Sequence, residues 1–338
     1  MYIWQQEEWP RFHWDNRAVL SSLARVRYEL GLLLGKLQAM WKNKDRTPLI
    51  KPTIDMNNRL SFLMSSCDAY EDLWHPFFDC INKFWQDIPY PVYLSTEHKQ
   101  FVPRQELAFS VKTLNQLDKY GDKAISWSRR FADALNRIES EYVFLVLDDF
   151  FCCDQVETSY FEEILDIMDK DASIASFQFN GTRIRNLKPS EYNGAKALEY
   201  KLIHRGGWKT HFVPTIWRKS VLLKWLRPWE SIWGFEGYGS ARARRWPSRY
   251  TEKVYIVSSP PIYDYLWIKD CSAVINGKWL NEPELIEFFA NNEIAVDYGY
   301  RGKMTRQEYE AVSMSDVLKR YTFRQKVVKA FNFMRSYF

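Results

Sequence analysis

The segment YVFLVLDD, residues 142–149, constrains the fold of this 338-residue chain more than any other. Six consecutive apolar residues, Tyr142 to Leu147, predict a strand that is buried on both faces, as in a parallel sheet covered by helices. Such a strand delivers Asp148 and Asp149 at its carboxyl end. Buried carboxylates need an ion pair, hydrogen bonds or a metal. The pair therefore predicts a site for a hard divalent cation, with a turn or a helix cap as the alternative.

The segments around this strand alternate between two kinds of pattern. Strand-like apolar runs and helix-like runs follow one another along the chain. The strand-like runs cover 60–67, 91–96 and 172–179, and the helix-like runs cover 70–85, 125–140 and 160–170. This order predicts an α/β fold with a mostly parallel central sheet and helices on both faces. Ligands of such sheets bind beyond the carboxyl ends of the strands, where Asp148 and Asp149 are expected.

The two ends of the chain have patterns of their own. Residues 1–41 predict an amphipathic helix behind an aromatic arm, because apolar residues recur at helical spacing from Leu20 to Leu37. Residues 42–58 are polar, contain two prolines and predict a linker. Residues 306–338 mix Lys and Arg with Phe, Val and Tyr and predict a basic amphipathic helix. That helix suits a membrane surface or, equally, a place packed on the domain.

Composition narrows the partners. The 15 Trp, 20 Tyr and 22 Phe exceed what a core needs and suit the grip of a sugar ring, a base or a lipid interface. The net charge is +5, and the basic run 241–249 suits an anionic partner such as a nucleotide diphosphate or lipid headgroups; we expect no nucleic acid.

Cysteine usage and hydropathy bear on the compartment. The chain has five cysteines, an odd number without metal-type spacing, which predicts reduced thiols. It shows no secretory signal and no apolar stretch of the roughly 18 residues that a membrane span requires. We therefore expect a cytoplasmic protein, with peripheral attachment to the inner face of the cell membrane as the alternative.

Three motifs together carry a resemblance to a known fold family. SSCDAYEDLW (65–74), SWSRRFADAL (126–135) and EYVFLVLDDFF (141–151) follow in the order and spacing of GT-A glycosyltransferases, particularly bacterial enzymes that assemble capsule or lipopolysaccharide chains. The resemblance covers about residues 59–300 and implies a GT-A-like domain over 59–305. In that family an acidic motif, often written DXD, holds a divalent cation, Mn²⁺ or Mg²⁺, and the diphosphate of a UDP- or GDP-linked sugar. Here Phe150 occupies the third position. Either Asp148 and Asp149 are the metal ligands, or Asp148 contacts the sugar and no metal is essential.

The same resemblance implies roles for individual residues. Those implied on the donor side are Ser65, Ser66 and Asp68 at the nucleobase and ribose, and Trp127 and Arg130 near the donor. Within the acceptor-like segment 211–245, Glu236 of the phrase WGFE would be the base of an inverting reaction, and Trp229 and Trp233 would stack on sugars. Glu230 is the competing carboxylate. INGKWL (275–280) and VDYGYRGK (296–303) resemble the closing part of these enzymes without an assigned role.

The N-terminal segment resembles another family. YIWQ, WPRFHWDN and LARVRYELGLLLGKLQAM are similar to the N-terminal domain of Fic-family proteins, which transfer AMP or related groups. Fic chemistry needs an HPFxxGNGR-type loop, and HPFFDCIN (75–82) lacks its glycines. The leading hypothesis is therefore a glycosyltransferase acting on a glycan or lipid-linked acceptor. The alternatives are a Fic-like nucleotidyl transferase and a non-catalytic carbohydrate- or protein-binding module.

Overall fold

The computed structural model describes residues 59–179, 198–203, 208–268 and 271–311. All of them belong to one unit of the chain, Ile54–Phe338. The predicted N-terminal helix and linker lie outside the described residues, as does the predicted C-terminal basic helix beyond residue 311.

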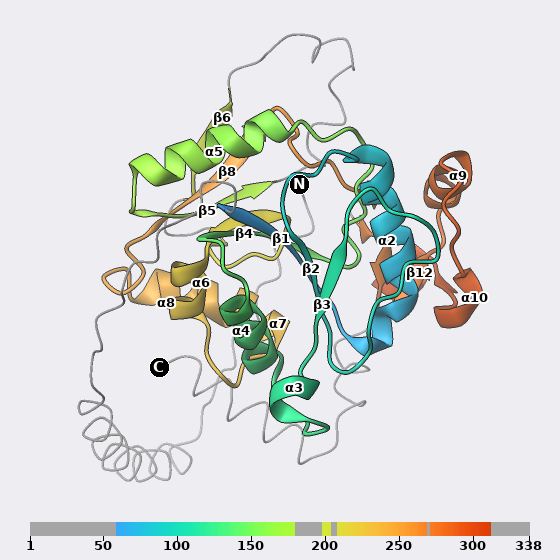
Figure 1. Ribbon diagram of the computed structural model, residues 1–338, viewed down its shortest axis with the longest axis horizontal. Helices are drawn as coiled ribbons and strands as arrows, with labels where there is room; N and C mark the ends of the chain where they lie inside the picture. The colour runs from blue at the N-terminus through green and yellow to red at the C-terminus, as the bar shows by residue number, and fades with distance from the viewer. Residues whose placement is uncertain (1–58, 180–197, 204–207, 269–270, 312–338) are drawn as a thin grey trace. The chain divides into compact units, whose positions relative to one another are not determined.

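An eight-stranded sheet forms the centre of the described structure (Figure 1). Its order is β3-β2-β1-β4-β7-β5-β8-β6. In chain order the strands are β1 Leu60–Ser65, β2 Val92–Ser95, β3 Val111–Leu114, β4 Tyr142–Leu147, β5 Ile174–Phe179, β6 Glu199–Leu202, β7 Thr215–Arg218 and β8 Lys253–Ser259. Only β7 and β6 pair antiparallel to their neighbours. The predicted α/β class with a mostly parallel central sheet is confirmed.

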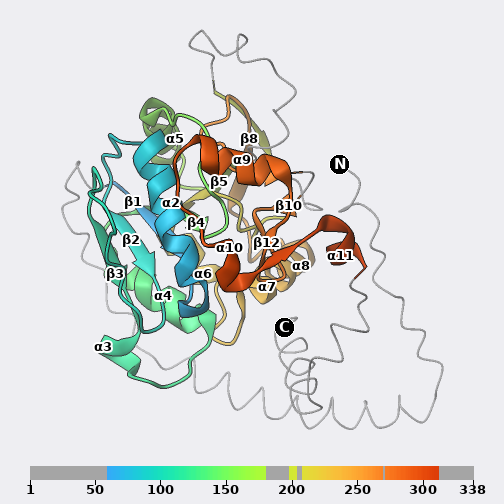
Figure 2. The same cartoon turned by 90° about the vertical axis from the view of Figure 1, so that its right-hand side faces the viewer.

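Helices cover both faces of this sheet. One face carries α2 Glu71–Phe84, α5 Thr158–Lys170 and α9 Pro283–Asn291, and the other carries α4 Trp127–Arg137, α6 Lys219–Trp225 and α8 Ser240–Arg245. Figure 2 shows α9 beside α2, and the rings of Phe84 and Phe288 stack there at 6.0 Å between centroids. Within the described part of the chain no helix is long and apolar enough to cross a bilayer.

Strand β4 explains why both faces are apolar. Its side chains alternate, so Phe144 and Val146 join the core beneath α2 and α5, whereas Val143 and Leu145 join the core beneath α4 and α6. All four are fully buried. A strand with two apolar faces reads as a continuous apolar run, which is the pattern that predicted it.

Shorter elements complete the described structure. They comprise the helical turns η2 Asp68–Tyr70, α3 Leu117–Tyr120, α7 Ile232–Gly234, η5 Phe235–Gly239, α10 Tyr298–Arg301 and α11 Arg306–Glu310, and the strands β9 Trp267–Ile268, β10 Cys271–Ser272, β11 Val274–Ile275, β12 Lys278–Leu280 and β13 Lys303–Met304. Several of them, η2, α7, η5, β10 and α10, contribute residues to the site described next.

Candidate active site at the carboxyl edge of the sheet

Strands β1, β2 and β4 end together at one edge of the sheet, here called the carboxyl edge. Ser65 pairs with Ser95 of β2 on one side and with Leu147 of β4 on the other. The residues that follow these strands are therefore neighbours, and Ser66 lies beside Asp148. This is the ligand-binding edge expected for a parallel sheet.

Asp148 is held in place by Ser66. The Ser66 hydroxyl donates to Oδ2 of Asp148, and Nε1 of Trp74 donates to the same hydroxyl at 2.7 Å. Asp148 is buried, with 8% of its surface exposed. The structure thus brings together Ser66 and Asp148, two of the predicted site residues, with Trp74 of α2 as a support that the sequence did not single out.

The two carboxylates share a site that disfavours negative charge. Burial, and then the charge of Asp149, raise the pKa of Asp148 to about 8. Burial also raises the pKa of Asp149 to about 6, although a hydrogen bond with Ser272 acts in the opposite direction. Neither has a Lys, Arg or His within ion-pair distance among the residues that the structure describes. The arrangement therefore favours a bound cation.

The carboxylate pair by itself is an incomplete ligand set. No group of three or more His, Cys, Asp and Glu able to hold a metal occurs within the described ranges. Mg²⁺ commonly uses one or two protein carboxylates and completes its shell with water and substrate phosphates. Asp148 and Asp149 fit that mode of binding, so the divalent cation stays a prediction that is compatible with the residues present.

Arg130 and Trp127 reach the carboxyl edge from α4. Ser126 caps this helix by accepting the N–H of Arg129. Nη1 of Arg130 donates to the Ser66 carbonyl at 2.8 Å, and Nε1 of Trp127 lies 3.4 Å from the Ser65 hydroxyl. Arg130 is buried, which lowers its pKa. Both side chains fix the end of β1, next to the carboxylates.

Asp68 also lies at this edge, where it fixes the loop after β2. Its carboxylate accepts the backbone N–H groups of Glu97, His98 and Lys99 at 3.1 to 3.2 Å. Burial alone would raise the pKa of Asp68, but these hydrogen bonds outweigh it and lower the pKa. The predicted contact of Asp68 with a base or ribose stays a prediction.

Glu236 approaches the carboxylate pair from the opposite half of the domain. It lies in the π-helical segment η5, between α7 and α8. Its Oε1 accepts the backbone N–H of Phe212 at 2.7 Å, and Nε2 of His211 lies 3.8 Å away. Burial raises the pKa of Glu236 to about 7, and the charge of Asp149 adds to the rise. Glu236 and Asp149 are thus close enough for their charges to interact. Short π-helical segments frequently mark functional sites.

Gly239 makes the turn around Glu236 feasible. A Cβ at this position would lie 2.7 Å from the Thr210 hydroxyl oxygen. That hydroxyl bonds to the carbonyl oxygens of Phe235 and Glu236, both at 3.0 Å. Glycine is needed here because the two segments approach so closely. Gly239 therefore serves the positioning of Glu236.

Glu230, the competing carboxylate, has a structural role. It is buried and forms a two-pronged ion pair with Arg242, which also donates to the Tyr250 hydroxyl at 2.9 Å. Ser128 binds the backbone carbonyl of Glu230. A carboxylate that is fully paired with a buried Arg is unavailable as a base, which leaves Glu236.

The predicted sugar-stacking rings differ in exposure. Trp233 has 75% of its surface exposed, whereas Trp229 is half-buried. A third ring, Trp208, is 45% exposed and lies 6.0 Å from the His211 ring, beside Glu236. The sequence did not indicate Trp208, because a lone Trp in a polar stretch carries no recognisable pattern.

Arg301 and Tyr70 were also missed. The Arg301 guanidinium lies over the Tyr70 ring at 4.5 Å, donates to Asp72 and to the Gly277 carbonyl, and its charge opposes part of the rise in the pKa of Asp148. The motif VDYGYRGK did contain Arg301, but only the tertiary structure brings α10 next to η2. Arg301 thus supplies positive potential beside the carboxylate pair.

The Fic-like stretch has another explanation. Residues 75–82 lie inside helix α2, where Pro76 and Phe77 are buried. A continuous helix offers no loop of free N–H groups for a phosphate. The HPF sequence is therefore part of a helix whose Pro76 and Phe77 are buried, and His75 is half-buried.

Comparisons with known proteins give matches at two levels. Residues 2–53 match a family described as "Domain of unknown function (DUF4172)". No curated protein matches the chain. Among solved structures, S. aureus TarS is 13% identical with a TM-score of 0.38, and the match covers 63% of this chain and 37% of that one.

Two further solved structures show the range of the likeness. The galactosyltransferase LgtC, in complex with donor and acceptor sugar analogues, is 9% identical with a TM-score of 0.36 and covers 71% of this chain and 99% of its own. A CMP:2-keto-3-deoxy-manno-octonic acid synthetase complexed with CTP is 11% identical with a TM-score of 0.33, over 61% and 94%. Scores and identities this low assign no function.

Proposed function

We propose that the protein is a transferase using a nucleotide-sugar donor, and specifically an inverting glycosyltransferase acting on a glycan or lipid-linked acceptor of a bacterial surface polysaccharide. One observation carries the proposal. Glu236 is a carboxylate with a pKa near neutrality, and it lies within electrostatic reach of Asp149 at the carboxyl edge of a mostly parallel sheet. Such pairs of titratable groups with shifted pKa values are typical of catalytic sites.

In the proposed reaction Asp148 and Asp149 would face the diphosphate of the donor through a divalent cation. A divalent cation held there, Mn²⁺ or Mg²⁺, would neutralise charge on the UDP or GDP leaving group. Ser66 keeps Asp148 oriented, and Arg130 and Trp127 keep the end of β1 in place. Ser65 and Asp68 lie at the same edge, so these residues together shape the donor side.

Glu236 takes the proton in this proposal. The acceptor hydroxyl forms a new bond to the anomeric carbon, the bond to the diphosphate oxygen breaks, and its electron pair departs with the nucleoside diphosphate. The hydroxyl proton passes to the Glu236 carboxylate. A base whose pKa is close to the working pH suits this task. The exposed ring of Trp233 and the half-buried ring of Trp229 would hold the acceptor sugar by stacking.

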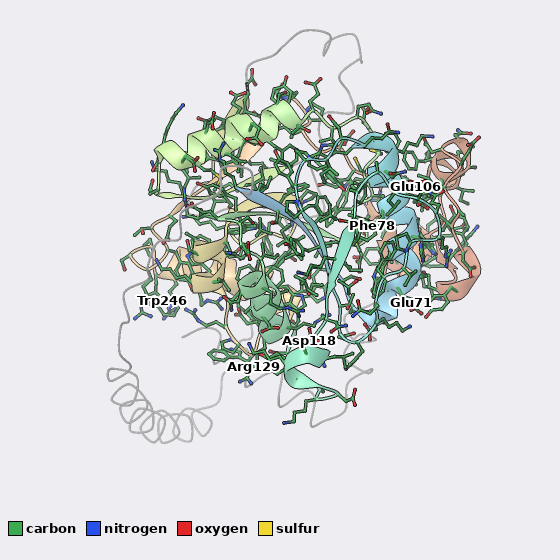
Figure 3. The ribbon with its side chains drawn as sticks, viewed as in Figure 1. Glu71, Phe78, Glu106, Asp118, Arg129 and Trp246 are labelled. Atoms are coloured by element: carbon green, nitrogen blue, oxygen red, sulfur yellow. The ribbon has the colours of Figure 1, made fainter. Side chains whose placement is uncertain are left out.

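A panel of nucleotide sugars, with and without Mn²⁺, tests the proposal by release of UDP or GDP. Glu236→Gln should lower acceptor-dependent turnover by about 10² to 10⁴, because general base catalysis contributes that much. Glu106→Gln is the matched control, since it makes the same change on an exposed side chain elsewhere (Figure 3). Near-normal turnover in a folded Glu236→Gln protein contradicts the role of Glu236. Transfer of AMP from ATP, or no reaction with any donor, contradicts the glycosyltransferase.

A further inference from the structure

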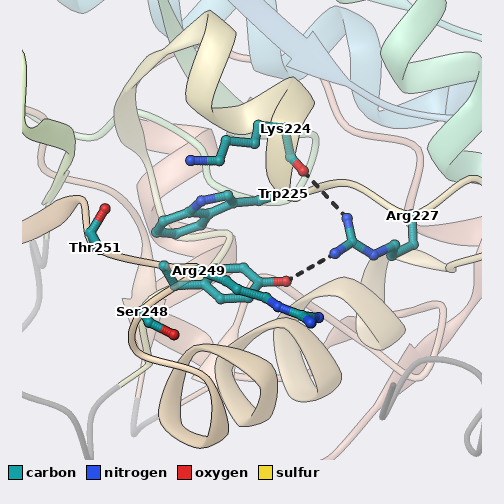
Figure 4. Close-up of a pocket in the computed structure, with 7 residues that line it drawn as sticks. Lys224, Trp225, Arg227, Ser248, Arg249 and Thr251 are labelled. Atoms are coloured by element: carbon teal, nitrogen blue, oxygen red, sulfur yellow. Dashed lines mark hydrogen bonds between the residues drawn. The ribbon is translucent and has the colours of Figure 1, made fainter. Parts of the chain in front are cut away.

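A second candidate site is a pocket of about 350 Å³, shown in Figure 4. It is lined by Lys224, Trp225, Arg227, Ser248, Arg249, Tyr250 and Thr251. Thr251 lies two residues before β8, whose first residue pairs with Ile174 at the start of β5. The pocket is therefore at the edge where the parallel strands begin, opposite the carboxyl edge.

The side chains that line the pocket are hydrogen-bond donors, and several are cationic. Each of the seven side chains carries a hydrogen-bond donor, and none is a carboxylate. Three of them are cationic, and only Lys224 is neutralised, by Glu252 at 2.6 Å. Arg249 is exposed and has no carboxylate partner among the described residues; its recorded contact is with the Trp246 ring at 5.8 Å. The pocket thus carries excess positive charge.

Arg227 is oriented by its surroundings. Nη1 donates to the backbone carbonyls of Lys224 and Leu226, at 3.3 and 3.2 Å, and Nη2 lies 3.3 Å from the Tyr250 hydroxyl. Figure 4 shows two of these bonds. A guanidinium held by neutral acceptors keeps its full positive charge for an incoming anion.

Two residues that line the pocket, Trp225 and Tyr250, carry buried hydrogen-bond donors. Nε1 of Trp225 has no hydrogen-bond partner within the described part of the chain, but the atom itself is shielded from solvent, so it lies beneath the pocket surface. The Tyr250 hydroxyl, also buried, accepts from Arg227 and from Arg242 at 2.9 Å, which leaves its own hydrogen to be donated. A donor without an acceptor is costly, so an oxygen-rich anion that reaches the Tyr250 hydroxyl would stabilise this pocket.

We propose that this pocket binds a phosphoryl group, carried either by a membrane lipid headgroup or by a soluble phosphate compound, through Arg227 and Arg249 with the hydroxyls of Ser248 and Thr251. Arginine suits this ligand because its planar fork matches two phosphate oxygens. The expected basic run 241–249 contributes to the site through Ser248 and Arg249 at its end. The proposal is independent of the reaction at the carboxyl edge.

Binding of inorganic pyrophosphate by calorimetry, with EDTA and at low salt, tests the soluble source. Flotation with phosphatidylglycerol and phosphatidylcholine vesicles tests the lipid source. Arg249→Gln and Arg227→Gln should each weaken binding by about tenfold, because each removes a charge-assisted hydrogen bond. Arg129→Gln, an exposed arginine on α4, makes the same change on another surface and should bind normally (Figure 3).

Each outcome decides the proposal. Pyrophosphate binding that depends on Arg249 assigns a soluble phosphate, and selective flotation with phosphatidylglycerol that depends on Arg249 assigns a lipid headgroup. Arg249 is exposed, so its substitution leaves the fold intact even if Arg227→Gln does not. Absence of binding in both arms overturns the site. Equal weakening by Arg249→Gln and Arg129→Gln also overturns it, because that result means diffuse attraction by surface charge.

Discussion

The candidate catalytic carboxylates at the carboxyl edge of the sheet differ in their partners from the carboxylates at the opposite edge. At the edge where the parallel strands begin, Glu141 pairs with Arg218 at 2.5 Å and Asp171 pairs with Lys253 at 2.8 Å. Arg59, just before β1, contacts three carboxylates of α5. At the carboxyl edge, burial raises the pKa values of Asp148, Asp149 and Glu236. The hydrogen bond from Lys253 lowers the pKa of Asp171.

This difference separates stability from function. Carboxylates that are paired with a Lys or Arg are stabilised in the charged form and help to hold the strands in register. Carboxylates that are buried together are stabilised when they bind a cation or when one of them takes up a proton. Glu230 and Glu236, six residues apart, show the same difference. Glu230 has a buried Arg as its partner, and Glu236 does not.

The largest expected effect is the loss of turnover when either carboxylate of the pair is removed. Asp148→Asn and Asp149→Asn should each lower donor turnover on the order of a hundredfold or more, because stabilisation of a leaving group by a bound metal is worth several kcal/mol. Initial rates of UDP or GDP release measure this. Asp118→Asn, on an exposed side chain, is the control. Equal rates in all three variants would mean that Asp148 and Asp149 have no role in turnover.

The opposite edge should respond in stability. Arg218→Gln removes the partner of Glu141 and leaves the backbone carbonyls of Ile174 and Met168 without their donor. The free energy of unfolding should fall by about 2 kcal/mol, because charge-assisted hydrogen bonds to two backbone carbonyls are lost, whereas the pair with the partly exposed Glu141 adds little. Urea unfolding measures the change, and turnover per folded molecule should stay the same. A loss of turnover without a loss of stability would mean that Arg218 acts in function and not in stability.

A smaller effect is expected from the group that orients Asp148. Ser66→Ala removes the hydroxyl that donates to Asp148 and should cost about 10- to 100-fold in metal affinity or activity, as supporting hydrogen bonds to ligands usually do. The Mn²⁺ concentration for half-maximal turnover is the measurement. Ser258→Ala, which removes a hydroxyl on β8, should leave it unchanged. An unaltered Mn²⁺ requirement in Ser66→Ala would separate Ser66 from the metal.

A further expected effect is the pH dependence of stability. The pKa of Glu236 is about 7 in the folded protein against 4.5 for an ordinary Glu, so the folded state holds the proton more tightly. This contribution is fully present below pH 4.5 and is lost as the pH rises through 7, with a slope of at most about 1.4 kcal/mol per unit. Glu236→Gln should therefore flatten the fall in stability between pH 5 and pH 8. Stability is measured by urea unfolding at each pH. If it falls equally with pH in the unmodified protein and in Glu236→Gln, the raised pKa of Glu236 is contradicted.

Much of the fold followed from local patterns. The apolar run 142–147 became β4 with the same bounds, and the helix expected at 125–140 became α4, Trp127–Arg137. These predictions succeeded because burial on both faces and helical periodicity leave direct marks in the sequence. Strand β7 was missed, since its four residues lie in a segment without period-two alternation.

The candidate site was only partly predictable. Ser66, Asp148 and Asp149 follow strands that could be recognised, and parallel strands end at one edge. Arg301 comes from a segment far along the chain from Asp148, Trp208 lies beside His211 and Glu236, and Trp74 reaches Ser66 only because α2 packs against the end of β1. Their positions depend on how helices pack on the sheet, which no local pattern encodes.

The sequence by itself determined that a buried strand ends in two carboxylates, because alternation and hydropathy are local properties. Only the tertiary structure decided which distant groups face them. Partners set whether an acidic side chain is neutralised, as Glu230 is, or keeps a raised pKa, as Glu236 does, and those partners are brought close by packing alone.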